Sequence, residues 1–364
     1  MPKGLKIAIN MGGGDAPGLN AVTEAVVLSA VNRNWEAYGI KNSYQGLLDT
    51  DEIVRLSPEK VWHISSLGGT ILGTTNKGNP FAMPITNMAG ETEIRDVSDK
   101  VVQNFKRLGF DCLVAVGGDG SLKIAYDLYR KGIPVIGVPK TIDNDLEATV
   151  ITFGFDTAVS IATEAIDRLH STARSHDRVM VVEVMGRHAG WIALNSGISG
   201  AADVILIPEI PFDMDKICSY ITEMELRGQR YAIVVAAEGA KPVGGDILSK
   251  GKGELGRQDV ILGGVGEYVA KEISSRTGKD TRSIVLGHLQ RGGSPTTFDR
   301  LLSLRFGAAA VRMIAEGKFG TMVILDPPEV RAIPLEEVIG KTKCVPLNSD
   351  TVQTGREIGI CFGD

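Results

Sequence analysis

The sequence lacks the features that mark disulfide-rich, zinc-binding and membrane-spanning proteins. Its four cysteines, Cys112, Cys218, Cys344 and Cys361, are widely separated and form no CxxC pair. This spacing argues against a zinc site or a disulfide framework and suits a reducing compartment, so a cytoplasmic location is expected. No run of 18 apolar residues occurs, which predicts no membrane span. The first ten residues, MPKGLKIAIN, lack the apolar core of a signal peptide and indicate a first strand instead.

An excess of basic residues is also missing. The 39 Lys and Arg are outnumbered by 44 Asp and Glu, which gives a net charge of −5. This balance disfavours nucleic acid or an anionic membrane as a partner. It does not exclude anionic substrates, because a local cluster of arginines can oppose the global sign.

What the sequence does contain is a regular alternation of short apolar runs and helical patterns. The runs are rich in Val and Ile and show little polar alternation, as do strands buried on both faces of a parallel sheet. They span Ile7–Met11, Leu113–Val116, Val135–Val138, Val179–Val184, Val204–Ile207, Ala232–Ala237 and Ile284–Leu286. The clearest helix is expected over Thr157–Thr172. The order predicts a doubly wound α/β protein, and 364 residues favour two domains, with a boundary just after Asp145.

Two glycine-rich loops follow predicted strands. The first, NMGGGDAPGLNA at residues 10–21, precedes an expected helix over Val22–Val31 and matches neither a Walker motif nor a clean GxGxxG. Glycines there let backbone N–H groups approach phosphate, but a structural turn explains the loop alone equally well. The second, VGGDGSLK at residues 116–123, places Asp119 at a strand end. Asp119 suits a magnesium-phosphate site or, alternatively, the cap of the next helix.

The stretch PKTIDND, residues 139–145, ends a buried strand in a cluster of polar groups. If it is extended, Asp143 and Asp145 point to the same face and repel each other unless a cation or a shared proton relieves them. Lys140 and bound Mg²⁺ are the candidate cations. An Asx-type turn is the alternative for this stretch. A purely structural explanation is harder to accept for all three polar loops, because each of them follows a predicted strand.

Basic residues bracket two further predicted strands. Arg178 and Arg187 flank one, and Arg282, His288 and Arg291 accompany the other. Arginines in such positions suit a phosphate held by bidentate contacts. Surface salt bridges for each arginine, and a core position for His288, are the alternatives.

Five ordered motifs, GGDAPGLN, GGDGS, PKTIDND, EVMGRHAGW and GHLQRGGSP, resemble those of the phosphofructokinases over nearly the whole chain, most closely the bacterial subgroup with mixed phosphoryl donors. The resemblance implies phosphoryl transfer to the 1-hydroxyl of fructose 6-phosphate, with Mg²⁺ and ATP. It implies two doubly wound α/β domains with mostly parallel sheets, an active site in the cleft between them, and a homodimer or homotetramer. The donor domain is expected over 1–150 with about 290–340, and the sugar-phosphate domain over 151–289 with about 341–364.

The same resemblance implies roles for individual residues. Asp143 is implied as general base, assisted by Thr141, Asp145, Arg187 and Gly14. The implied sugar-phosphate contacts are Arg178, Met185, Gly186, Glu238, Arg282, His288 and Arg291, with Arg178 and Arg282 coming from a neighbouring subunit. The implied donor contacts are Gly13, Gly14, Tyr44, Asn76, Lys77, Gly118, Asp119, Gly120, Ser121 and Lys140, and Asp119 is the implied metal ligand.

Two departures from the family pattern stand out. Asn76 occupies the place where many members have an arginine that reaches the transferring phosphate. Lys77 follows, and its ammonium group offers a point charge rather than the planar, bidentate guanidinium of an arginine. Glu24 and Leu28 stand where allosteric members carry two effector-binding arginines. Classical control by a nucleotide or phosphoenolpyruvate is therefore not expected.

The alternatives lie inside and outside this family. NAD kinases and lipid kinases share GGDG loops but are not expected to have TIDND and MGR at these places. A non-catalytic sugar-phosphate sensor is disfavoured by the intact Asp119, Asp143 and Arg187. Pyrophosphate is the rival donor: Lys140 is typical of pyrophosphate users, whereas Gly120 leaves room for the ATP α-phosphate where they have aspartate. Ile124 is larger than the residue that many ATP-specific members have near the ribose. We weigh Gly120 more heavily, because a clash excludes a ligand more strongly than a cation selects one, and we expect ATP.

Overall fold

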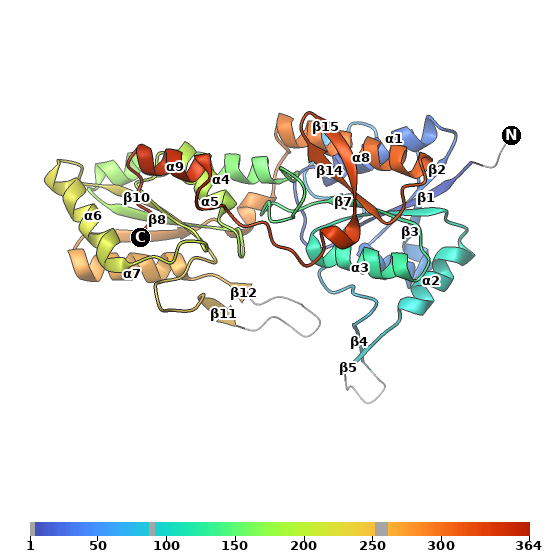
Figure 1. Ribbon diagram of the computed structural model, residues 1–364, viewed down its shortest axis with the longest axis horizontal. Helices are drawn as coiled ribbons and strands as arrows, with labels where there is room; N and C mark the ends of the chain where they lie inside the picture. Colours follow the sequence, from blue (N-terminus) through green and yellow to red (C-terminus); the bar gives the residue numbers. More distant parts are fainter. Residues whose placement is uncertain (1–3, 87–91, 252–260) are drawn as a thin grey trace.

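The computed structural model describes residues 4–86, 92–251 and 261–364, which form two lobes, each built on a mainly parallel sheet (Figure 1). The first lobe holds a seven-stranded sheet and the second a four-stranded sheet. Two small antiparallel hairpins, β4–β5 and β11–β12, lie outside these sheets. The strands of these hairpins are β4 (Met83–Thr86), β5 (Thr92–Arg95), β11 (Ser249–Gly251) and β12 (Ile261–Leu262).

The seven-stranded sheet has the order β15-β14-β7-β6-β1-β2-β3. Its two edge strands are antiparallel to their neighbours and its inner strands are parallel. The strands are β1 (Lys6–Met11), β2 (Glu36–Ile40), β3 (Ile53–Leu56), β6 (Cys112–Gly117), β7 (Val135–Pro139), β14 (Thr321–Asp326) and β15 (Glu329–Pro334). One face of the sheet is covered by α1 (Leu19–Val31) and α8 (Thr297–Ala315), which share a hydrophobic core with it. The other face forms a second core with α2 (Ser98–Arg107) and α3 (Asp119–Arg130).

The four-stranded sheet is parallel throughout, in the order β13-β8-β10-β9. Its strands are β8 (Val179–Val184), β9 (Val204–Leu206), β10 (Ala232–Ala237) and β13 (Thr281–Val285). Helices α4 (Phe155–Ser175) and α5 (Trp191–Ser199) share one core with it, and α6 (Met214–Leu226) and α7 (Val265–Thr277) the other. The last helix, α9 (Asp350–Glu357), packs against α5.

The chain passes between the lobes after β7, after β13 and again after the short helix η6 (Leu335–Glu337). The second passage is η5 (Gly287–Arg291), and the third is the red segment that reaches α9 in Figure 1. Loops at the carboxyl ends of parallel strands and these passages therefore meet where the lobes face each other, which is where open α/β sheets bind ligands.

The predicted α/β fold is confirmed, and a strand is present near each predicted apolar run. The last of these strands, β13, was predicted to be buried but is mostly exposed, because it lies at the edge of its sheet. Val179–Val184 and Ala232–Ala237 have the predicted bounds, whereas the last strand lies earlier than predicted, at Thr281–Val285. The predicted helix over Thr157–Thr172 lies within α4. The division of the sequence into donor and sugar-phosphate domains stays a prediction. Among the described residues, no helix is both long and apolar enough to span a bilayer.

Candidate active site

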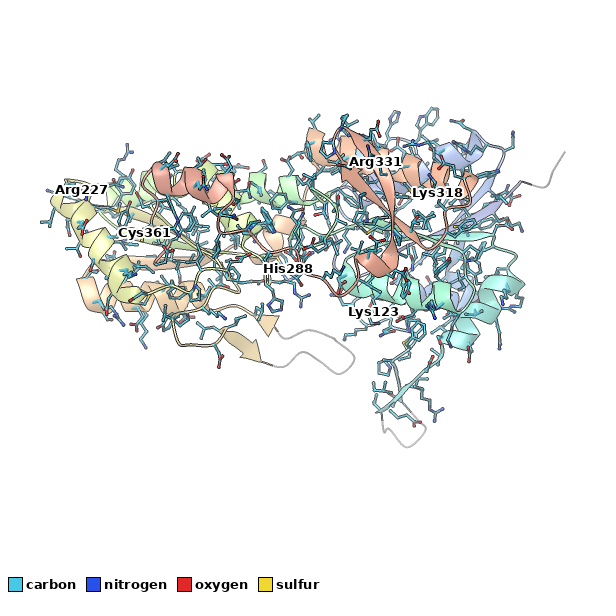
Figure 2. The ribbon with its side chains drawn as sticks, viewed as in Figure 1. Lys123, Arg227, His288, Lys318, Arg331 and Cys361 are labelled. Atoms are coloured by element: carbon cyan, nitrogen blue, oxygen red, sulfur yellow. The ribbon has the colours of Figure 1, made fainter. Side chains whose placement is uncertain are left out.

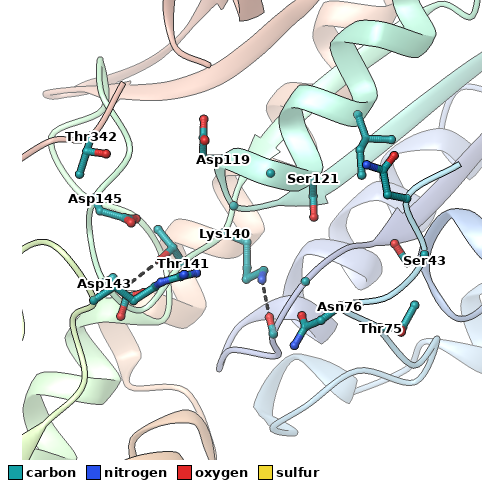
Figure 3. Close-up of a pocket in the computed structure, with 18 of the residues that line it drawn as sticks. Ser43, Thr75, Asn76, Asp119, Ser121, Lys140, Thr141, Asp143, Asp145 and Thr342 are labelled. Atoms are coloured by element: carbon teal, nitrogen blue, oxygen red, sulfur yellow. Dashed lines mark hydrogen bonds between the residues drawn. The ribbon is translucent and has the colours of Figure 1, made fainter. Parts of the chain in front are cut away.

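A cleft of about 320 Å³ opens where the two lobes meet (Figure 3). It is lined by the ends of β1, β6 and β7, by the turn after β8, and by η5 and the segment after η6. Thirteen of the predicted site residues line it: Gly13, Gly14, Asn76, Gly118, Asp119, Gly120, Ser121, Lys140, Thr141, Asp143, Asp145, Arg187 and Arg291. The three polar loops singled out in the sequence are thus brought to one place.

The two glycine-rich loops pack against each other because they lack side chains at the contact. A Cβ atom on Gly12 would lie 2.4 Å from the Ser121 hydroxyl oxygen, and one on Gly14 would lie 2.9 Å from Nη1 of Arg291. The Gly12 N–H donates to the Val116 carbonyl at 2.8 Å, which joins the loop after β1 to the end of β6. Glycine is therefore required at position 12 by its close approach to Ser121, which is independent of any ligand, whereas at position 14 the end of the flexible Arg291 side chain could move.

Lys140 follows Pro139 at the end of β7, and its side chain is buried. Its ammonium group donates to the carbonyl oxygen of Gly14 (Figure 3), so it lies beside the first glycine-rich loop. Burial and, to a smaller extent, the charge of Arg291 lower the pKa of Lys140 to about 7, against the opposing effect of Asp143. A phosphate bound at this loop would favour the charged ammonium.

Asp143 is 3% exposed, yet its Oδ1 atom has no hydrogen-bond partner among the described residues. Its backbone N–H donates to the Thr141 hydroxyl at 3.0 Å, which fixes the turn. Burial raises the pKa of the Asp143 carboxyl; the charge of Glu238 adds to this, while Arg291, Arg187 and Lys140 oppose it. A buried, basic carboxylate with a vacant acceptor is suited to take a proton from a bound hydroxyl.

Asp145 is half-buried and lines the same cleft. Burial raises its pKa to about 6, and the neighbouring Asp143 charge raises it too. The repulsion expected between these two carboxylates is therefore present in the fold. Among the groups that relieve it are Arg187, close to both, and Arg291 and Lys140 beside Asp143.

Arg187 lies in a turn with an unusual backbone. Gly186 has φ of 139° and Arg187 itself has φ of 51°, a value that few residues with side chains adopt. The Arg187 N–H donates to Oε1 of Glu238 at 3.2 Å. Burial raises the pKa of Glu238, and this backbone hydrogen bond lowers it. The turn thereby aims a guanidinium into the cleft from the second lobe.

Arg291 reaches the cleft from η5. Its Nη1 atom donates to the Asp15 carbonyl at 2.9 Å, so the guanidinium is held against the loop after β1. Its charge favours the ionised form of Asp143 and disfavours that of Lys140. Arg291 therefore belongs to the electrostatic centre of the cleft as well as to its wall.

Asp119 begins α3 and is half-buried at the edge of the cleft. Its Oδ1 atom accepts a hydrogen bond from the Gly340 N–H at 2.7 Å. Asp119 and Asp145 provide carboxylate oxygens on one cleft, which are the ligands that Mg²⁺ prefers alongside substrate phosphates and water. Within the described ranges, no cluster of three His, Cys, Asp or Glu residues could hold a metal without such help.

The comparisons with known proteins agree with this geometry. The family model described as Phosphofructokinase matches residues 6–314. The chain is 49% identical over 361 residues to "ATP-dependent 6-phosphofructokinase 2" of Clostridium perfringens, covering 99% of this chain and 98% of that protein. It is 48% identical over 359 residues to "ATP-dependent 6-phosphofructokinase" of Chloroflexus aggregans, with the same coverage. The chain belongs to the phosphofructokinase family.

A solved structure supports the fold of this family member. The structure of Pichia pastoris phosphofructokinase in the T-state superimposes with a TM-score of 0.78 at 31% identity, over 99% of this chain. That yeast chain is longer, and this chain spans 37% of it. The family predicted from the sequence motifs is confirmed by these findings.

Two of the predicted donor contacts of this phosphofructokinase lie outside the cleft lining. The Tyr44 side chain is buried, and its hydroxyl donates to the Ser121 carbonyl at 2.8 Å. Tyr44 therefore supports the GGDGS loop from the side facing away from the cleft, and the structure does not favour a direct contact with the donor. Lys77 is exposed beside the cleft, whereas its neighbour Asn76 lines it.

Of the predicted sugar-phosphate contacts, Arg291 lines the cleft, and the other six divide into two groups. Met185, Gly186 and Glu238 lie next to the cleft without lining it, around the turn that carries Arg187. Three others lie farther out: Arg178 just before β8, Arg282 in β13 and His288 in η5. His288 is exposed in the region between the lobes (Figure 2). The last three are not brought to the cleft within one subunit.

The structure also adds residues that the sequence motifs missed. Ser43, Thr75 and Asn79 line the donor side of the cleft, and His188, Lys341 and Thr342 close it. His188 was within a quoted motif, and its position after Arg187 was a usable signal. Lys341 and Thr342 lie in a segment with no motif, so no sequence signal pointed to them.

Proposed function

We propose that this chain is an ATP-dependent 6-phosphofructokinase, which transfers the γ-phosphoryl group of ATP to the 1-hydroxyl of fructose 6-phosphate. The observation that carries the proposal is the buried Asp143 carboxylate. It faces a cleft containing Lys140, Arg187 and Arg291, and its Oδ1 atom accepts no hydrogen bond from the part of the chain that the structure describes. The names of relatives that align over the full chain support the choice of donor and acceptor.

Asp143 acts in this proposal as the general base. The sugar 1-hydroxyl donates its proton to the Asp143 carboxylate while the hydroxyl oxygen attacks the γ-phosphorus, and ADP leaves. Arg187 and the N–H of Gly14 neutralise charge on the moving group. Phosphoryl transfer depends mainly on positioning and charge stabilisation, and this cleft supplies both.

Mg²⁺ is the proposed cofactor, with Asp119 and Asp145 as the carboxylates that would hold it together with donor phosphates. When bound, it supplies positive charge that neutralises these phosphates. Thr141 fixes the turn that carries Asp143, and Lys140 offers a further cation to the donor. The raised pKa of Asp145 fits a carboxylate that gains a cation in the complex.

The remaining parts of the proposal concern the assembly and its location. Arg178, Arg282 and His288 would bind the 6-phosphate across a subunit boundary, which explains why one subunit leaves Arg178 and Arg282 outside its own cleft. The protein would then be a homodimer or homotetramer. A cytoplasmic location is proposed from its widely spaced cysteines.

The test is a coupled assay for fructose 1,6-bisphosphate with fructose 6-phosphate, Mg²⁺ and either ATP or pyrophosphate. Asp143→Ser should lower kcat by about 10²–10⁴-fold, the usual contribution of a positioned base, without loss of fold. Asp203→Ser is the matched control. Asp203 lies outside the cleft, and its carboxylate accepts a hydrogen bond from the Ile233 N–H at 2.8 Å. An Asp143→Ser enzyme within tenfold of wild type removes Asp143 from this role.

Pyrophosphate remains the second candidate donor, and Lys140 is the observation that favours it. Its buried ammonium at the first glycine-rich loop can bind the phosphates of either donor. Robust turnover with pyrophosphate and little with ATP in the same assay would reverse the choice.

A further inference from the structure

The segment 340–345, called here the connecting segment, joins η6 to α9 and contacts two of the loops that build the cleft, those that carry Asp119 and Asp145. The Gly340 N–H donates to Asp119 at 2.7 Å, and the Lys343 N–H donates to the Asp145 carbonyl at 2.8 Å. The Val345 N–H donates to Glu209 at 2.8 Å, and Glu209 also accepts the Gly190 N–H at the start of α5. A segment without a recognisable motif thus ties both lobes to the site.

The Lys343 side chain is the anchor of this segment. Its ammonium nitrogen lies 2.9 Å from Oδ1 of Asn144, 2.9 Å from the Thr149 carbonyl and 3.1 Å from the Val150 carbonyl. Three acceptors match the three N–H donors of an ammonium group. The nitrogen also lies 5.6 Å from the centre of the Trp191 ring, whose Nε1–H donates to the Lys343 carbonyl at 2.8 Å.

Asn144 connects this anchor to the chemistry. It lies between Asp143 and Asp145 and has φ of 52°, in the left-handed region. Its amide oxygen accepts from Lys343 and also from the Thr152 N–H at 3.1 Å. Held from two sides, Asn144 fixes the backbone direction from which both flanking carboxylates leave.

We propose that Lys343 is a positioning residue for phosphoryl transfer, which acts through Asn144 to set where Asp143 and Asp145 stand in the cleft. The inference rests on the proposed function of Asp143 and adds a residue that does not line the cleft. Small displacements matter here, since a misplaced reacting group can cost about 10²-fold in rate.

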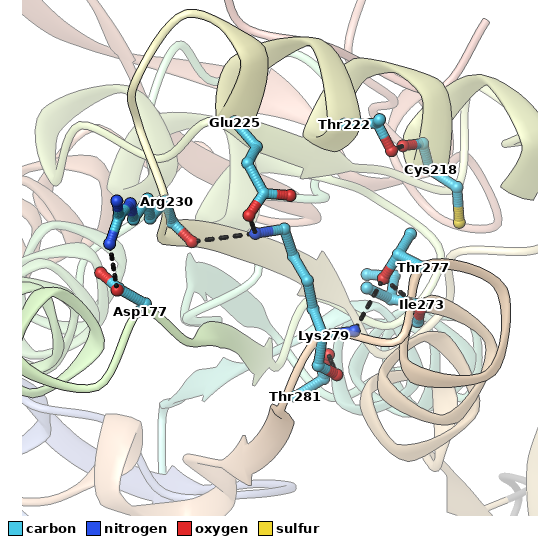
Figure 4. Close-up of polar contacts among 9 residues, drawn as sticks. All are labelled: Asp177, Cys218, Thr222, Glu225, Arg230, Ile273, Thr277, Lys279 and Thr281. Atoms are coloured by element: carbon cyan, nitrogen blue, oxygen red, sulfur yellow. Dashed lines mark hydrogen bonds and ion pairs between the residues drawn. The ribbon is translucent and has the colours of Figure 1, made fainter.

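A lysine that only stabilises the fold should affect the melting temperature but not kcat, and the chain contains such a lysine for comparison. Lys279 is also largely buried; its ammonium donates to the Arg230 carbonyl at 3.1 Å and pairs with Glu225 at 3.0 Å (Figure 4). It joins the end of α6 to the start of β13, away from the cleft. Lys279→Met therefore removes a comparable number of contacts without touching the loop that carries Asp143.

The experiment compares Lys343→Met with Lys279→Met in thermal melting and in steady-state kinetics. Lys343→Met should lower kcat by about 10- to 100-fold with KM for fructose 6-phosphate changed less than about threefold, because positioning of the base fails while sugar contacts remain. Lys279→Met should lower the melting temperature and keep kcat within about twofold. Equal, small effects of the two variants on kcat overturn the proposal.

A double-mutant cycle tests the route through Asn144. Asn144→Gly tolerates the positive φ and removes only the amide, so it should reproduce the loss of kcat, and adding Lys343→Met should lower kcat little further. Fully additive losses overturn the route, and Asn144→Gly carries the test should Lys343→Met not fold. Lys343→Arg should restore part of kcat. If Asp143→Ser leaves kcat unchanged, the proposed function is rejected instead. If Asp143→Ser lowers kcat but Lys343→Met leaves kcat at the wild-type value, only this inference is rejected.

Discussion

Nε of Arg178 lies 2.6 Å from Oδ2 of Asp280, and the other oxygen of the same carboxylate lies 2.8 Å from Nη1 of Arg282. One acid thus holds side by side the two arginines that the motifs assign to a sugar phosphate. The Arg178 side chain is 25% exposed and the Arg282 side chain 61%. The pair is therefore preformed on the surface of the chain, as the proposed binding of a phosphate held by a neighbouring subunit requires.

Removing either arginine should weaken binding of fructose 6-phosphate more than it slows the chemistry. Hydrogen bonds to charged groups contribute about 1.5–3 kcal/mol, so Arg178→Ala or Arg282→Ala should raise KM about 10- to 100-fold. Arg168→Ala is the control, because Arg168 pairs with Glu164 on the exposed side of α4, away from the cleft. A KM within about threefold of wild type for both variants would contradict the assignment.

Mixing subunits tests whether the site is shared. Arg178→Ala chains and Asp143→Ser chains should each be weakly active alone. Mixed oligomers should regain partial activity, because some clefts then combine an intact Asp143 with an intact Arg178 of the neighbour. No recovery, despite subunit exchange demonstrated with tagged chains, would place both residues in one subunit's site.

How far the sequence predicts this molecule depends on the range of the contacts. Ala232–Ala237 was predicted with its bounds because a strand buried on both faces shows an uninterrupted apolar run. The edge strand β15, with its alternating exposed and half-buried residues, carries no such run and was missed. The three polar loops were predicted as candidate site residues because each follows a predicted strand.

Other parts of the site depend on contacts that no local pattern encodes. The Gly340 N–H reaches Asp119 across 221 residues of sequence, and Lys343 reaches Asn144 across 199. Tyr44 was predicted to touch the donor from the family resemblance alone. Only the packing shows that the ring points inward, with its hydroxyl on the Ser121 carbonyl.

The pH dependence of kcat/KM for ATP should be bell-shaped. Asp143 and Asp145 work as carboxylates, and burial raises the pKa of both, that of Asp145 to about 6. Activity should therefore fall as the pH drops towards and through 6, with an apparent pKa that belongs to the pair. On the alkaline side, Lys140 has its pKa lowered to about 7 by burial, so donor binding should weaken as the pH rises above 7 and the ammonium is lost.

Lys140→Met separates the two limbs of this profile. The variant should bind ATP less tightly than wild type below about pH 7 and similarly at higher pH, where wild-type Lys140 is neutral. Its alkaline limb should therefore disappear while the acid limb remains. Measurement of kcat/KM at saturating fructose 6-phosphate from pH 5 to 9 checks this. An unchanged alkaline limb would assign that limb to another group.

Classical effector control should be absent or weak. Glu24 on α1 accepts the Ser65 N–H at 2.7 Å, which holds a carboxylate where allosteric family members offer an arginine. An effector phosphate would meet like charge there. Saturation with fructose 6-phosphate should be hyperbolic and unaffected by ADP or phosphoenolpyruvate at fixed ATP. Sigmoidal saturation that ADP relieves would disprove this.

The donor preference should depend on Gly120. This residue lies in the first turn of α3, directly after Asp119, and it lines the cleft. Gly120→Asp should preserve the fold, because an acidic residue is favourable in the first turn of a helix. In the cleft, however, its carboxylate would occupy the space of the α-phosphate of ATP and repel it. Use of ATP should therefore fall by orders of magnitude.

Pyrophosphate has no third phosphate to clash with Asp at position 120, and Lys140 is already in place to bind it. Gly120→Asp should thus retain or gain some pyrophosphate-dependent activity while ATP-dependent activity falls. Gly120→Asn is the matched control, since it adds similar volume without charge and separates the clash from the repulsion. If Gly120→Asp leaves kcat/KM for ATP within tenfold of wild type, position 120 does not select the donor, and the preference must come from the adenosine side of the cleft, where Ile124 lies.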